Sequence, residues 1–199
     1  MPELVLASQS AARRAMLTAA GVPFEALSPH VDEDEIKASL KAQGSGARDI
    51  ADALAEVKAV KLSNKLPGAL VLGADQVLVT ADGALLDKPT DRAAAAAQLR
   101  GLAGQEHRLI SAAVVAENGK PVWRVVDSAK LRMRQFGDEF LDRYLDAEGE
   151  AILGCVGAYR LEGLGAQLFT KVDGDHFTVL GLPLLALLDY LRVRGVISA

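Results

Sequence analysis

Residues 4–17 read LVLASQSAARRAML, an apolar run followed by an alanine-rich segment. Short apolar runs bounded by polar residues are typical of buried strands, and alanine-rich segments with apolar residues at helical spacing favour helices. We therefore predict a strand over residues 3–7 and a helix over residues 11–20, with Gly21 ending the helix. The polar residues of the stretch then lie where a strand leads into a helix.

Those polar residues are two serines and two arginines. Ser8 and Ser10 precede Arg13 and Arg14 at the start of the predicted helix. Backbone N–H groups and the helix dipole favour an anion there, and hydroxyl and guanidinium groups can bind its remaining oxygens. The segment therefore predicts a phosphate cradle. The alternative is that Ser10 only caps the helix and that the arginines form a solvated face, and the local pattern leaves both open.

The rest of the chain supplies more elements of both kinds. Strands and helices alternate without internal repeats, which predicts an α/β fold with a mixed sheet, two lobes and a groove between them. The predicted strands are 23–28, 69–74, 76–80 paired with 84–86, 108–117 paired with 120–134, and 166–172. The predicted helices are 49–62, 91–102, 137–145 and 182–193, while 32–35 lead into a helix and 154–165 are expected to be a loop.

Composition narrows the class of protein. The chain has 199 residues, a net charge of −4 and a single cysteine, so it can bury a core and cannot form an internal disulfide. We expect a reducing, cytoplasmic location with no export signal, because polar residues interrupt the first apolar run. The acidic balance argues against nucleic acid as a partner, and no apolar run reaches the ~20 residues that a membrane span needs.

Charged residues from several segments are the kinds that a nucleoside triphosphate requires. Cations neutralise phosphates, a carboxylate can hold a divalent metal, and a second carboxylate can take a proton from water. Asp75 follows the apolar VLGA at residues 71–74, so we place it at the end of a buried strand, where function is favoured. Glu33, in an acidic run, and Lys58, on a helix with Lys61, are also typical of a solvated surface.

Several motifs together resemble the Maf family of nucleoside triphosphate pyrophosphatases. They occur in family order over nearly the whole chain and are LASQSAARR at 6–14, Asp32-Glu33, GADQV at 73–77, Lys88-Pro89 and GLPLLAL at 181–187. The resemblance implies a single domain over residues 1–199, with a fold like that of Maf and inosine triphosphatase proteins and a nucleotide-binding cleft. It also implies a hydrolase of phosphoric anhydrides that cleaves a nucleotide between its α and β phosphates, releasing a nucleoside monophosphate and pyrophosphate.

The resemblance also implies roles for individual residues. Asp75 corresponds to the proton acceptor of the family, in agreement with its predicted position after a buried strand. The implied cofactor is a divalent metal, Mg²⁺ or Mn²⁺, which we assign to Glu33. The implied substrate-binding residues are Ser8, Ser10, Arg13, Arg14, Lys58 and Lys88.

Three positions bear on the choice of base. Gln76 after Asp75 and Glu162 before Gly163 make the chain similar to the branch acting on 7-methylguanosine triphosphate. A carboxylate can accept hydrogen bonds from a guanine edge, and a methylated guanine is cationic. That branch, however, has an aromatic residue where Ala12 stands. Losing a stacking platform costs roughly 1–3 kcal/mol per base, so other bases stay open.

The remaining signals add few alternatives. His30, His107 and His176 lack metal-binding spacing, no P-loop motif is present, and Cys155 in an apolar run favours the core over a nucleophile. The alternative to a house-cleaning enzyme is a nucleotide-sensing regulator of cell division. An RNA-binding protein is disfavoured, because the sequence has no stripe of basic and aromatic residues. For an enzyme of this size we expect a homodimer.

Overall fold

The structure is a computed structural model that describes residues 4–198. The chain divides into two compact units. Unit 1 comprises the residues up to Gln76, Ile110–Asp127 and those from Gly181 onward, and unit 2 comprises Val77–Leu109 and Ser128–Leu180.

The strands confirm the predicted mixed sheet. They are β1 (Leu4–Ala7), β2 (Glu25–Leu27), β3 (Leu70–Thr80), β4 (Leu85–Leu86), β5 (Glu106–Glu117), β6 (Lys120–Met133) and β7 (Phe169–Asp173). Among the described residues they form a seven-stranded sheet in the order β2-β1-β3-β5-β6-β7, with β4 on β3. β1 is parallel to β2 and β3, whereas β4 and β7 are antiparallel to β3 and β6.

The helices lie close to their predicted ranges. They are α1 (Ala11–Ala19), α2 (Glu33–Ala42), α3 (Ala47–Ser63), α4 (Arg92–Leu102), α5 (Asp138–Glu148), α6 (His176–Val179) and α7 (Leu184–Val193). The sequence patterns did not indicate the short α6 or the 3-10 helices η1 (Gly149–Gly154) and η2 (Leu164–Leu168). Within residues 4–198, no helix combines the length and the apolar character needed to cross a membrane.

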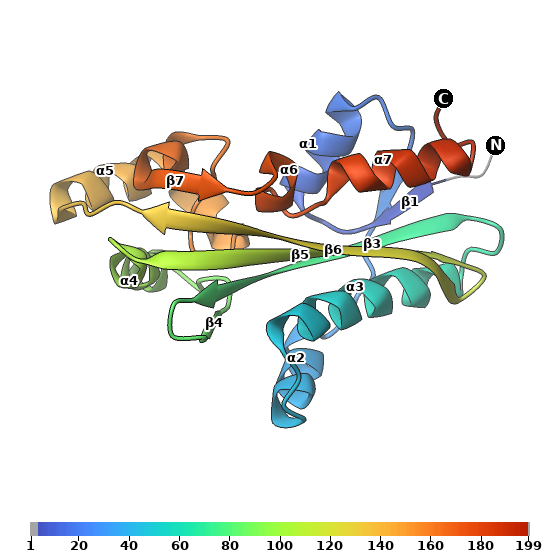
Figure 1. Ribbon diagram of the computed structural model, residues 1–199, viewed down its shortest axis with the longest axis horizontal. Helices are drawn as coiled ribbons and strands as arrows, with labels where there is room; N and C mark the ends of the chain where they lie inside the picture. Colours follow the sequence, from blue (N-terminus) through green and yellow to red (C-terminus); the bar gives the residue numbers. More distant parts are fainter. Residues whose placement is uncertain (1–3, 199) are drawn as a thin grey trace. The chain divides into compact units, whose positions relative to one another are not determined.

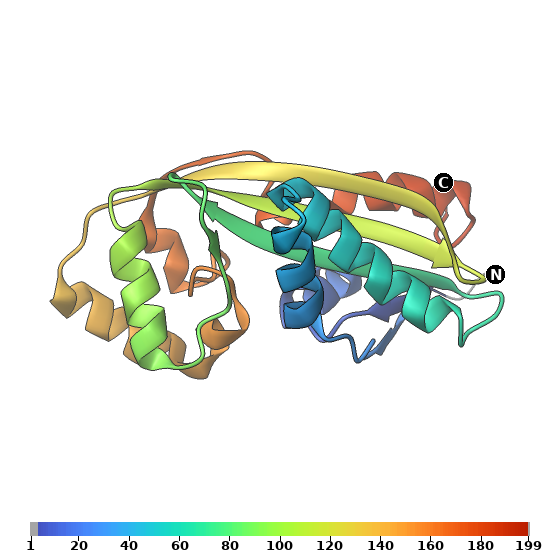
Figure 2. The same cartoon turned by 90° about the horizontal axis from the view of Figure 1, so that it is seen from below.

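Unit 1 packs helices on both faces of its part of the sheet. α3 lies on one face and α1 and α7 lie on the other (Figures 1 and 2). Parallel strands covered on both faces are apolar throughout, and every residue of β1 is buried accordingly. Leu17 of α1 and Leu54 of α3 are almost fully buried in this core.

The third strand corrects one prediction. We expected it to end at Asp75, but β3 continues through Asp75 to Thr80, because Val77, Leu78 and Val79 extend the buried apolar run. A carboxylate inside a strand is tolerated here because it is ion-paired with Lys58. The predicted hairpin is confirmed, since Leu78 and Val79 pair with β4.

Unit 2 has its own core, which includes buried residues of α4 and α5 such as Leu99 and Leu141. The predicted strand over 166–172 is wrong in its first half, where residues 164–168 form η2 and the strand starts at Phe169. A Cβ at Gly165 would lie 2.2 Å from the Arg160 carbonyl oxygen, so the chain folds back tightly on itself before the strand. Such a return is compatible with a 3-10 turn rather than an extended strand.

Candidate active site

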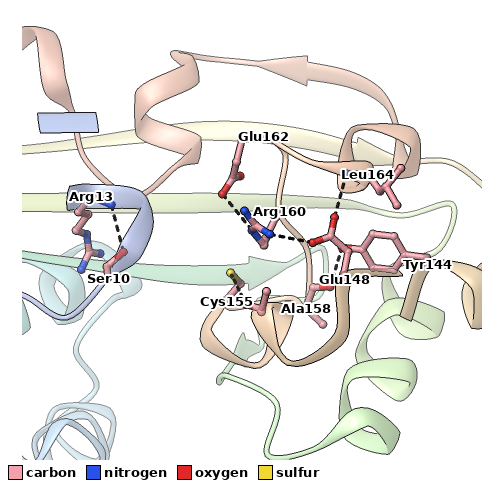
Figure 3. Close-up of polar contacts among 10 residues, drawn as sticks. Ser10, Arg13, Tyr144, Glu148, Cys155, Ala158, Arg160, Glu162 and Leu164 are labelled. Carbon is pink, nitrogen blue, oxygen red and sulfur yellow. Dashed lines mark hydrogen bonds and ion pairs between the residues drawn. The ribbon is translucent and has the colours of Figure 1, made fainter. Parts of the chain in front are cut away.

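A serine caps the helix at the strand-to-helix connection of unit 1. Ser10 is the N-cap of α1, and its hydroxyl accepts a hydrogen bond from the Arg13 amide at 3.4 Å (Figure 3). The Ser8 hydroxyl is buried and accepts from the Ser10 amide at 3.2 Å. Both serines therefore order the beginning of α1.

The two adjacent arginines have different environments. Arg13 is only 8% exposed, and its guanidinium donates to the Gly181 carbonyl at 2.8 Å and to the Ala74 carbonyl at 2.9 Å. Arg14 is exposed and donates to the Gln9 carbonyl at 3.2 Å. Only Arg14 therefore matches the solvated helix face that was the alternative to a cradle.

A cluster of three side chains, which we call the carboxylate–lysine cluster, joins α2, α3 and β3. Lys58 of α3 is 5% exposed, and its Nζ lies 2.6 Å from Asp75 Oδ1 and 2.9 Å from Glu33 Oε1. Asp75 is 6% exposed, whereas the Glu33 side chain is 41% exposed. A buried lysine bonded to two carboxylates is electrostatically compensated, so the surface interpretation of Lys58 is wrong.

The cluster forms because α3 passes very close to β3. A Cβ at Gly73 would lie 2.1 Å from the Ala55 carbonyl oxygen and 2.7 Å from the Ala59 amide nitrogen. Only glycine admits that approach, and Gly73 and Asp75 share a face of β3 because side chains alternate along a strand. Gly73 belongs to the GADQV motif, but the motif alone indicates no role for it. A glycine two residues before a strand acid is the signal that could have indicated the helix contact.

Arg13 completes the electrostatics of this region. Burial lowers the pKa of the Arg13 guanidinium below its ordinary value, and the Asp75 and Glu33 carboxylates partly offset that effect. Because arginine stays protonated in proteins, a buried cation lies within electrostatic range of both carboxylates. The region thus contains two carboxylates and two cationic side chains.

Gln76, the residue after Asp75, belongs to the same unit. Its side-chain amide donates to the Ser111 hydroxyl at 3.0 Å, and Ser111 is fully buried. No sequence pattern indicates Ser111, which lies in an apolar strand without a recognisable motif. Ala12 is half-buried in the first turn of α1.

The other two predicted residues belong to unit 2. Lys88 is exposed just after β4. The Glu162 carboxylate accepts from Arg160 Nε at 3.4 Å, and Arg160 also bonds Glu148 at 3.2 Å (Figure 3). Glu148 further accepts from the Leu164 amide at 3.0 Å, so these contacts order the segment that carries Glu162.

Two further candidates are a metal site built on several side chains and the Cys155 thiol. Among the described residues, no group of three or more His, Cys, Asp or Glu side chains could hold a metal ion. Burial raises the pKa of the Cys155 thiol, which favours the unreactive protonated form.

The fold and the site together define the class of protein: an α/β protein with a mixed sheet and a buried group of acidic and basic side chains where β3 meets α3. A family model described as Maf-like protein matches residues 3–194. The chain belongs to this family, which confirms the resemblance.

Relatives of similar length support the assignment. A nucleoside triphosphate pyrophosphatase of Caulobacter vibrioides is 56% identical over 98% of this chain and 97% of its own length. One of Ruegeria pomeroyi is 53% identical over 98% of both chains.

Among solved structures, a HAM1 protein from Coxiella burnetii aligns with 67% of this chain and 73% of its own length, at 16% identity and a TM-score of 0.44.

Proposed function

We propose that this chain is a nucleoside triphosphate pyrophosphatase, which hydrolyses a nucleotide to the monophosphate and pyrophosphate. The observation that carries the proposal is the buried Asp75, held by Lys58 at 2.6 Å beside a second carboxylate and a buried arginine. Such groups suit phosphoryl chemistry, which depends on positioned charges. The names of the Caulobacter and Ruegeria relatives support the same activity.

In the proposed reaction Asp75 is the proton acceptor. Lys58 bonds Oδ1 of Asp75, and we assign Oδ2 to accept a proton from the attacking water. The water oxygen bonds to the α-phosphorus, the bond to the oxygen bridging the α and β phosphates breaks, and pyrophosphate leaves with those electrons. Because Lys58 is fixed between two carboxylates, it orients Asp75 before substrate arrives.

The carboxylates also suit a divalent metal. Mg²⁺ prefers oxygen ligands and is commonly held by one or two carboxylates together with substrate phosphates rather than by a complete protein cage. The partly exposed Glu33, beside Asp75, fits that description. When bound, Mg²⁺ or Mn²⁺ would stabilise negative charge on the phosphates.

The remaining predicted residues are assigned to the substrate. We propose that Ser8, Ser10, Arg14 and Lys88 contact phosphate oxygens, because hydroxyl, guanidinium and ammonium groups are all donors. Arg13 contributes positive charge from its buried position.

The base is assigned to other side chains. Gln76 and Glu162 are proposed to read its edge, and 7-methylguanosine triphosphate is the first modified nucleotide to compare. Ala12 offers no aromatic surface for stacking, so we also propose that ordinary bases be compared.

Pyrophosphate release from common and methylated nucleoside triphosphates tests the activity. Asp75→Asn should lower kcat at least about a hundredfold while nucleotide binding survives, because it removes the proton acceptor but keeps the shape. Asp189→Asn is the matched control, since Asp189 is exposed on α7 and should leave release unchanged. Tight binding without release by the unchanged protein would refute the enzyme and favour the nucleotide-sensing regulator.

The same assay tests the base assignment. Glu162→Gln should change the ratio of kcat/KM between methylated and ordinary guanine nucleotides, because it removes the negative charge. An unchanged ratio would contradict the role of Glu162.

A further inference from the structure

Arg13 donates three hydrogen bonds to other described residues of the protein. Nε donates to the Gly181 carbonyl at 2.8 Å, and Nη1 donates to the Ala74 carbonyl at 2.9 Å and the Ser8 hydroxyl at 3.3 Å. One side chain thus joins the end of β1, the middle of β3 and the segment before α7. All of these residues lie in unit 1.

The bond to Ala74 bears directly on the proposed proton acceptor. The Ala74 carbonyl and the Asp75 amide belong to one planar peptide group, so fixing that carbonyl also fixes the backbone orientation at Asp75. Lys58 fixes the carboxylate end of the same residue at 2.6 Å. Asp75 is therefore held at its backbone through Arg13 and at its side chain by Lys58.

The segment at Gly181 is shaped to receive Arg13. Gly181 has a φ of +97°, which side chains rarely adopt, and a Cβ there would lie 3.4 Å from Arg13 Nη2 and 3.5 Å from Nε. Glycine lets the backbone turn its carbonyl toward the guanidinium without strain. The adjacent Arg14 is exposed and donates to the Gln9 carbonyl at 3.2 Å, as expected from the rotation of about 100° between successive helix positions.

We propose that Arg13 is a positioning residue, which orients Asp75 through the Ala74–Asp75 peptide and the Gly181 carbonyl, while Arg14 provides the phosphate-binding guanidinium. This proposal rests on the proposed pyrophosphatase activity. It divides the arginine pair by function: one acts on the rate of the chemical step and the other on substrate affinity.

The test compares Arg13→Lys with Arg14→Lys by steady-state pyrophosphate release and by equilibrium binding of an α,β-methylene triphosphate analogue. Arg13→Lys keeps the charge but loses the fork, so kcat should fall at least about tenfold, since a 1 Å misplacement can cost about a hundredfold. The analogue Kd should change by less than about twofold. Arg14→Lys should show the reverse, with higher KM and Kd and a kcat near that of the unchanged protein. Arg192→Lys is the neutral control, because the Arg192 side chain is exposed on the outer surface of α7.

Two outcomes would overturn the proposal. One is an Arg13→Lys variant with raised KM and Kd and unchanged kcat, which would make Arg13 a phosphate ligand. The other is an unchanged kcat in Gly181→Ala, which tests the Arg13 contact without altering the guanidinium. Gly181→Ala also replaces Arg13→Lys if that variant does not fold, and its expected result is a lower kcat at unchanged analogue Kd.

A failure of the proposed pyrophosphatase activity can be distinguished from a failure of the positioning role of Arg13. If the unchanged protein binds nucleotides but releases no pyrophosphate, the enzyme assignment fails. The positioning role of Arg13 is then tested by the rate of hydrogen exchange at the Asp75 backbone amide. Arg13→Lys should then exchange faster than Arg192→Lys at that amide. Equal exchange rates would overturn the positioning role as well.

Discussion

The close approach of α3 to β3 at Gly73 can be tested by adding one methyl group. In Gly73→Ala, the new Cβ would meet the Ala55 carbonyl oxygen at 2.1 Å and the Ala59 amide nitrogen at 2.7 Å. Both are backbone atoms and cannot rotate away, so α3 must withdraw by roughly 1 Å to restore van der Waals contact. Overpacking of this kind costs about 1–3 kcal/mol in the free energy of unfolding.

The same displacement should affect catalysis. Lys58 lies on the turn of α3 that contains Ala59, so its Nζ would move relative to Asp75, now 2.6 Å away. A shift of that size is expected to lower kcat by up to about a hundredfold. Urea unfolding followed by circular dichroism gives the stability change, and pyrophosphate release gives kcat.

Gly101→Ala is the matched control. Gly101 lies in α4 with nothing within 4 Å of an added Cβ, so alanine there should be neutral or stabilise by up to about 1 kcal/mol. If Gly73→Ala matches the unchanged protein in both unfolding midpoint and kcat, the close-approach argument is refuted.

Two further predictions concern stability. Burial lowers the pKa of His107 to about 4, and its Nε2 lies 2.7 Å from the Tyr159 hydroxyl. As the pH falls, the histidine of the unfolded chain, with a pKa near 6.5, is protonated before the buried His107 of the folded protein. The free energy of unfolding should therefore be unaffected by this residue above about pH 6.5 and should fall by about 3 kcal/mol between pH 6.5 and pH 4. Urea titrations across that range should show a smaller loss in His107→Gln, and an equal loss in both proteins would contradict the assignment. Leu17→Ala should cost about 2–5 kcal/mol because Leu17 is fully buried, whereas Leu185→Ala, at 59% exposed, should change stability by less than about 0.5 kcal/mol; similar values for both would be inconsistent with this core.

Local sequence pattern predicted the helices and strands well where the spacing of apolar residues matches the side chains that the fold buries. Along β6, the alternation of charged and apolar residues over Lys130–Met133 is typical of a strand with one solvated face, and Leu131 and Met133 are buried while Lys130 and Arg132 are exposed. Local pattern was wrong about the end of β3, because an acid within an apolar run favours a loop unless a partner from another element neutralises it. That partner, Lys58, is distant in sequence.

The sequence by itself determined the α/β class, the order of most elements and the family, because these depend on local periodicity and on motifs that occur in order. Only the tertiary structure decided that Lys58 is buried between Glu33 and Asp75 and that Arg13, unlike Arg14, lies inside. The physical reason is that a charged side chain can be buried only where other elements supply its partners. Which elements meet is decided by packing, here by the absence of a Cβ at Gly73.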